Sequence, residues 1–217
     1  MAGSCCQNQP TFTGLSPAYR RRLWLVIAIN ATMFVVEMVA GHLAGSQALQ
    51  ADALDFFGDT LTYGLSLAVL GAPLAVRSTA ALVKAASLVV MGVWVLAATA
   101  YRVLVLGVPD AGVMGAVGVL ALGANIASVL LLVRYKDGDA NVRSVWLCSR
   151  NDAIGNIAVV VAALGVWGTT TGWPDLIVAA LLASLFLWSA VQIWAQAMRE
   201  RRSTIPPAVQ PSRLLKQ

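Results

Sequence analysis

Residues 111–135 read AGVMGAVGVLALGANIASVLLLVRY, and Arg134 is the only charged residue in the stretch. An α-helix rises about 1.5 Å per residue, so roughly 20 apolar residues cross the ~30 Å hydrocarbon core of a bilayer. A stretch this long and this apolar is typical of a membrane-spanning helix. It therefore predicts an integral membrane protein.

Five further apolar stretches repeat this pattern, separated by turn signals such as Gly45-Ser46 and Gly172-Trp173-Pro174. Of the 217 residues, 59% are hydrophobic and only 12% are charged, whereas soluble domains carry about 25% charged residues. The predicted fold is an all-α integral membrane protein, a bundle of six transmembrane helices in one domain. The predicted spans are 23–44, 53–73, 79–106, 111–135, 145–168 and 174–197.

The basic residues predict the orientation of the bundle. The net charge is +5, and the basic residues flank the apolar spans. This placement is better explained by a role in orienting the protein in the membrane than by nucleic-acid binding. With six spans, one side receives all the basic flanking residues except Arg102: Arg20, Arg21, Arg22, Arg77, Lys84, Arg134, Lys136, Arg143, Arg150, Arg199, Arg201, Arg202, Arg213 and Lys216. Because Lys and Arg gather on the cytoplasmic side, both termini are expected in the cytoplasm of a multi-pass inner (plasma) membrane protein. The expected organisation is a cytoplasmic segment over 1–22, a transmembrane domain over 23–197 and a disordered cytoplasmic tail over 198–217.

Acidic residues inside the second predicted span are the first functional signal. Asp55 and Asp59 are four residues apart and so share one helix face, and Asp52 lies on the same stripe. An Asp at mid-span costs about 2.5–3.5 kcal/mol on insertion scales. Three like charges on one apolar helix coexist only when some are protonated or when a cation lies among them. A divalent cation would resolve this repulsion.

The fifth span offers the complementary half of such a site, because Cys148 and Asp152 are also four residues apart. If the two faces meet, Asp55, Asp59, Cys148 and Asp152 supply three oxygens and one sulfur. Four ligands from two helices suit a tetrahedral ion such as Zn²⁺, and a thiolate extends the choice toward Cd²⁺.

Several residues have a purely structural alternative. Asp52 could be a helix-start residue in the headgroup region, and Asp55 and Asp59 could pair with a cation in another span: Lys84, Arg102 or Arg150. Cys148 taken alone is typical of a small buried hydrophobic residue.

Other polar residues in the spans have no assigned role. Glu37 is either a proton-handling group or a structural acceptor, and His42 is typical of an interfacial residue. Asn30, Asn125, Asn151 and Asn156 could be interhelical hydrogen-bond partners. Cys5 and Cys6 could capture a soft metal or be a free pair.

No enzyme signature is present. The sequence has no Gly-rich phosphate loop and no HExxH, and with His42 as the single histidine it has no Ser/His/Asp set. The chain is therefore not expected to be an enzyme, and no prosthetic group is expected. Without a nucleotide site, transport would draw its energy from an ion gradient.

The residues resemble the cation diffusion facilitator family of metal/proton antiporters over about 23–197. The stretch 45–59, GSQALQADALDFFGD, carries the most distinctive motif. The first span matches through Asn30, Phe34, Glu37 and Gly41, the fifth through Asp152, and the sixth opens with Pro174-Asp175.

The resemblance implies a transport site of two residues from the second span and two from the fifth, at Asp55, Asp59, Cys148 and Asp152. Members commonly carry His at the position of Cys148 and often at that of Asp55, so this chain departs from the usual zinc ligands. Most members have a cytoplasmic metal-binding domain after the last span. This chain is expected to be a short form without it, so a homodimer would assemble through the transmembrane helices.

The predicted function is secondary active export of a divalent transition-metal cation from the cytoplasm in exchange for protons. Zn²⁺ is the first choice, with Cd²⁺, Co²⁺ or Ni²⁺ as alternatives. Protons and metal compete for the same deprotonated ligands, which would couple the two fluxes. Two other functions stay open: a proton-coupled small-molecule exporter, and a membrane sensor or scaffold that binds metal without transporting it.

Overall fold

The computed structural model describes residues 16–68, 74–105, 107–135 and 140–203. Cys5, Cys6 and the tail after 203 lie outside this part. The described elements, all of them helical, are α1 (Pro17–Ala44), α2 (Gln47–Ala68), α3 (Leu74–Val105), α4 (Ala111–Leu132), the 3₁₀ turn η1 (Val133–Tyr135), α5 (Ala140–Thr169) and α6 (Trp173–Ser203). The predicted all-α fold is confirmed.

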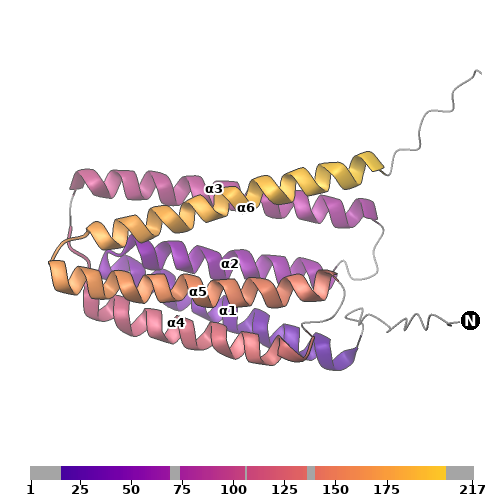
Figure 1. Ribbon diagram of the computed structural model, residues 1–217, viewed down its shortest axis with the longest axis horizontal. Helices are drawn as coiled ribbons and strands as arrows, with labels where there is room; N and C mark the ends of the chain where they lie inside the picture. Colours follow the sequence, from indigo (N-terminus) through magenta and orange to yellow (C-terminus); the bar gives the residue numbers. More distant parts are fainter. Residues whose placement is uncertain (1–15, 69–73, 106, 136–139, 204–217) are drawn as a thin grey trace, which may run out of the picture.

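The six long helices run up and down along a common axis (Figure 1). α3 and α6 lie side by side as a pair, and α1, α2, α4 and α5 form the rest of the bundle. α2 packs against α1, α3, α5 and α6 and so joins the two groups. The helix with the most acidic residues is therefore the central one.

Within the described residues, five helices are long and apolar enough to cross a membrane: Pro17–Ala44, Thr79–Val105, Ala111–Tyr135, Asp152–Thr169 and Trp173–Arg199. α2 is not among them, although its 22 residues are about enough to cross the ~30 Å hydrocarbon core. It carries Asp52, Asp55 and Asp59, which lower its hydropathy, and the other helices surround it. The other five helices thus shield the polar face of α2 from lipid.

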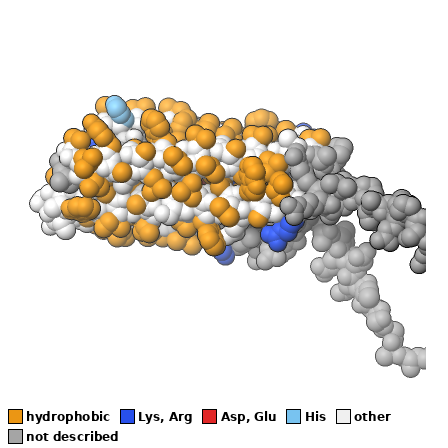
Figure 2. Space-filling model, turned by 90° about the horizontal axis from the view of Figure 1, so that it is seen from above, with side chains coloured by type: hydrophobic (Ala, Val, Ile, Leu, Met, Phe, Trp, Pro, Cys, Tyr) orange, Lys and Arg blue, Asp and Glu red, His pale blue; other side chains and the backbone are white. Residues whose placement is uncertain are grey.

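The outer surface of the bundle is apolar. Hydrophobic side chains cover the length of the face in Figure 2, and Lys and Arg side chains lie toward one end. Leu104, Leu43 and Trp167 are 83%, 79% and 77% exposed. An apolar surface of this extent is out of place in water and suits contact with acyl chains.

The predicted bounds of the second span were wrong, because α2 begins at Gln47 rather than at 53 and ends at Ala68. Gly45 ends α1 in a left-handed conformation, with φ 69°, which glycine adopts without strain. Ser46 then caps α2, since its Oγ accepts a hydrogen bond from Leu49 N–H at 3.0 Å. The first turns of α2 are too polar to count as membrane-spanning by hydropathy alone.

The start of α6 holds the start of α2. Asp175 Oδ1 accepts hydrogen bonds from Ser46 Oγ at 2.6 Å and Ala48 N–H at 3.0 Å, and Oδ2 accepts one from Gln47 N–H at 2.8 Å. A carboxylate is favourable at a helix N-terminus, where backbone N–H groups lack intrahelical partners. Asp175 thus fixes α6 against α2 at one end of the bundle.

Candidate metal-binding site

Asp55 and Asp59 lie near the middle of α2, one helical turn apart. Asp59 is 8% exposed, and Asp55 is half-buried. α2 packs against α5. The two carboxylates are therefore deep in the bundle, as the helical spacing predicts.

Asp152 of α5 joins this pair. Its side chain is within hydrogen-bonding reach of the carboxyl groups of both Asp55 and Asp59. Ionised carboxylates only accept hydrogen bonds, so three of them side by side require a proton or a cation among them. The structure thus brings together the acidic residues that the sequence assigned to opposite halves of one site.

Tyr63 adds a hydrogen-bond donor to the site. Its hydroxyl donates to Asp59 Oδ2 and lies 3.3 Å from Ser149 Oγ of α5. Tyr63 and Ser149 are 0% and 1% exposed. Neither residue was predicted from the sequence, although Tyr63 stands one helical turn after Asp59. This chain of contacts links the Asp59 carboxylate to α5 a second time.

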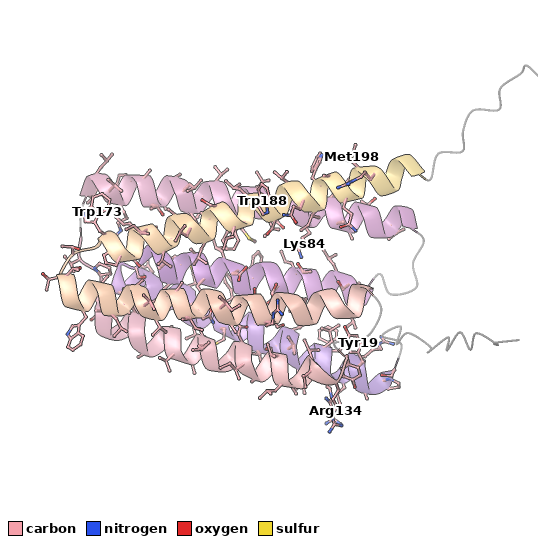
Figure 3. All side chains as sticks on the ribbon, viewed as in Figure 1. Tyr19, Lys84, Arg134, Trp173, Trp188 and Met198 are labelled. Carbon is pink, nitrogen blue, oxygen red and sulfur yellow. The ribbon has the colours of Figure 1, made fainter. Side chains whose placement is uncertain are left out.

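Lys84 supplies a positive charge from α3. It acts electrostatically on both Asp55 and Asp59, and Figure 3 shows its side chain extending from α3 toward α2. Of the cations considered as structural partners, Arg102 acts on Asp175 instead, at the opposite end of the bundle. Arg102 is therefore not a partner of Asp55 or Asp59.

The fourth predicted ligand, Cys148, lies in α5 one turn before Asp152, and its side chain is outside the described part of the structure. Among the described side chains, no group of three or more His, Cys, Asp or Glu residues has the arrangement of a formed metal site. Asp55, Asp59 and Asp152 are thus close together but do not have the geometry of a metal-coordination site, and the four-ligand set stays a prediction.

Asp52 is not a helix-start residue, because α2 begins at Gln47. It lies in the second turn of α2, is 1% exposed and contacts the carboxyl group of Glu37 on α1. Glu37 is 0% exposed. A second acidic pair therefore lies inside the bundle, closer to the Asp175 end of α2 than the first.

Two of the four asparagines considered as interhelical hydrogen-bond partners make no such bond among the described residues. Asn30 and Asn156 are 1% and 0% exposed, yet their amide groups have no hydrogen-bond partner among the described residues. Asn125 is 2% exposed, and the side chain of Asn151 is not described. His42 is exposed near the end of α1, as expected for an interfacial residue.

Comparison with known proteins identifies the family. The cation efflux transmembrane domain matches residues 75–200. The chain belongs to the cation efflux family. It is 32% identical to the zinc transporter ZitB of Escherichia coli K12 over 83% of this chain, and 25% identical to the metal cation efflux system protein CzcD of Cupriavidus metallidurans over 80%.

The chain spans less than two thirds of these relatives. The alignments cover 62% of the length of the Escherichia coli protein and 58% of the Cupriavidus metallidurans protein. The matched domain begins at residue 75 and so does not include Asp55 and Asp59. The membrane-spanning helices and the family agree on a membrane-embedded cation efflux domain, whereas the ligand set depends on the geometry of α2 and α5.

Proposed function

We propose that this protein is a secondary active transporter that exports a divalent transition-metal cation from the cytoplasm in exchange for protons. The single observation that carries the proposal is the contact of Asp152 on α5 with both Asp55 and Asp59 on α2. Three carboxyl groups enclosed in a membrane bundle are costly unless protons or a cation occupy them in turn. That alternation is what an exchanger requires.

The proposed site comprises Asp55, Asp59, Cys148 and Asp152. Three oxygens and one sulfur suit tetrahedral Zn²⁺, and the sulfur extends the choice to Cd²⁺, Co²⁺ or Ni²⁺. The naming of a relative as a zinc transporter supports Zn²⁺ as the first choice. Tyr63 orients Asp59, and its hydrogen bond favours the ionised carboxylate that binds metal.

The proposed cycle has two states. In the first, the site is open to the cytoplasm, binds the metal with deprotonated ligands and carries it as cargo. In the second, the helices have rocked to open the site outward, and protons neutralise the carboxylates and displace the metal.

The basic helix ends of α1, α3, α5 and α6 lie at one end of the bundle (Figure 1), which supports placing that end on the cytoplasmic side of an inner (plasma) membrane. The proposed assembly is a homodimer held together by the transmembrane helices.

The test is metal uptake by proteoliposomes that contain the purified protein under an imposed pH gradient. Zn²⁺, Cd²⁺, Co²⁺ and Ni²⁺ are compared for the wild type, Asp55→Asn and Asp152→Asn. Asp110→Asn is the matched control, because Asp110 is an exposed carboxylate that caps α4 and Asn caps a helix equally well. We expect proton-driven uptake that both site variants lose and the control keeps.

Other outcomes would favour the two other functions. Metal binding without flux in folded wild-type protein would favour a sensor or scaffold. Absence of both binding and flux for all four ions would favour a small-molecule exporter that uses the carboxylates for protons alone. In that exporter Cys148→Ser would leave transport unchanged, whereas in the metal transporter it changes the ranking of the ions.

A further inference from the structure

The acidic pair formed by Glu37 and Asp52 has no role in the proposed metal ligand set. Glu37 is 0% exposed, and neither of its carboxyl oxygens receives a hydrogen bond from a donor in the described residues. Asp52 is 1% exposed, and its Oδ2 also lacks a donor. Two fully enclosed acids without donors need an explanation, because buried polar groups are normally satisfied.

The two carboxyl groups interact across the packed helices α1 and α2, and both are enclosed there. Two ionised carboxylates can only accept hydrogen bonds, so neither can satisfy the other unless one of them carries a hydrogen. Two like charges in contact inside a low-dielectric bundle would otherwise repel strongly. The geometry therefore calls for a proton shared between Glu37 and Asp52.

The surroundings supply no other cation among the described residues. Asp55 is the charged group that acts on Glu37 from beyond the pair, and it is negative. Of the other helices packed on α1 and α2, α4 has no titratable residue. The cations of α3 act on other acids, Lys84 on Asp55 and Asp59 and Arg102 on Asp175. α5 contributes Asp152 to Asp55 and Asp59, and α6 contributes Asp175 at the start of α2. The nearby Gln50 amide donates to the carbonyls of Gly41 and Ser46 instead, at 3.3 and 3.1 Å.

We infer that Glu37 and Asp52 form a proton-binding site distinct from the metal ligands, and that it releases a proton when a divalent cation binds at Asp55. A proton fits better than a metal ion here, since two enclosed carboxyl groups offer fewer ligands than the four to eight that protein-bound metals take. Asp52 precedes Asp55 by one helical turn, so a cation at Asp55 lowers the free energy of the deprotonated pair. The inference rests on the proposed function and adds one proton to the exchange.

Proton release on metal binding tests the inference directly. Metal is added to the detergent-solubilised protein in weak buffer, and a pH indicator reports the protons released per bound ion. We expect Glu37→Gln to bind the metal and to release about one proton fewer than the wild type. Asp52→Asn should give the same change, the double variant no further change, and Asp110→Asn none. Unchanged release by Glu37→Gln with intact metal binding would overturn the inference.

An infrared measurement separates this inference from the proposed function. The protonated pair has a carboxylic-acid C=O stretch, which should disappear in the Glu37→Gln/Asp52→Asn variant and weaken when metal binds to the wild type. If the wild type binds no metal, the proposed function fails, and the same band, followed while pH alone is changed, still reports the proton site. A spectrum that is identical in the wild type and the double variant would overturn the proton site even where metal transport is established.

Discussion

The Asp175 carboxylate accepts a 2.6 Å hydrogen bond from the Ser46 hydroxyl, so the first turn of α6 is joined to the residue that caps α2. The N–H groups of Gln47 and Ala48 complete the set of donors to Asp175. All of these donors are buried with Asp175, which is 1% exposed. The contact therefore positions the helix that carries Asp55 and Asp59 from a point several turns away.

Asp175→Ala should lower the stability of the bundle by about 3 kcal/mol, because it leaves three buried donors without an acceptor. Asp175→Asn keeps one acceptor oxygen and should have a smaller effect. The apparent melting temperature in detergent measures the change. Asp110→Ala is the control, since it removes one exposed cap worth about 1 kcal/mol. Equal losses for Asp175→Ala and Asp110→Ala would contradict the assigned role.

Tyr63→Phe should weaken metal binding about 10-fold without unfolding the protein, which is the lower end of the effect of groups that orient metal ligands. The substitution removes the hydroxyl that donates to Asp59 and leaves the ring in its buried position. Isothermal titration with Zn²⁺ measures the affinity. Tyr101→Phe, at a tyrosine that is 66% exposed on α3, should bind like the wild type. A wild-type affinity for Tyr63→Phe would show that Asp59 does not need this donor.

Lys84→Gln should strengthen binding of divalent cations several-fold. The Lys84 ammonium interacts electrostatically with Asp55 and Asp59. It would therefore repel a metal ion bound by these two carboxylates. Lys84→Arg keeps the charge and should leave the affinity close to that of the wild type. Equilibrium competition with a chelating dye measures both variants. Weaker binding by Lys84→Gln would mean that Lys84 holds the carboxylates in place rather than competing with the metal.

Gly92→Ala should destabilise the pairing of α3 and α6 by about 1–3 kcal/mol, as overpacking does in tightly packed cores. A Cβ at Gly92 would lie 2.9 Å from Leu187 Cδ2 and 3.2 Å from the Ala183 carbonyl oxygen. Small residues permit close helix contacts in membranes for this reason. Thermal unfolding of the purified protein measures the loss.

Leu187→Ala provides the matched test of that prediction. Placed together with Gly92→Ala, it should recover part of the lost stability, because it removes the two Leu187 atoms nearest to the added methyl group. Strictly additive effects of the two substitutions would indicate that the residues do not contact each other.

Hydropathy predicted all six helices with ends up to six residues from the observed ones, because an apolar stretch long enough to cross a bilayer has no other stable arrangement there. The second is displaced at both ends, because Gln47, Gln50 and Asp52 are polar residues in a helix that other helices surround. The helical spacing of Asp55 and Asp59 is a local property and was readable from the sequence. The caps at Gly45 and Ser46 were also signalled locally, as a turn.

Contacts between helices were not readable in the same way. The sequence favoured a meeting of α2 and α5 only on chemical grounds, and it left Glu37 and Asp52 without partners. Asp152 and Lys84 come from α5 and α3, and their convergence on Asp59 of α2 depends on how those helices are rotated and staggered. Small differences in packing free energy between many side chains decide those rotations.

By itself, then, the sequence determined that the chain is a bundle of membrane helices with its acids on defined helix faces, because the bilayer and the helical repeat act on each segment separately. Only the tertiary structure decided that Asp152 meets Asp55 and Asp59, that Glu37 meets Asp52, and that Asp175 holds the start of α2. Each of these contacts joins residues on different helices, and the packing of the whole bundle brings them together.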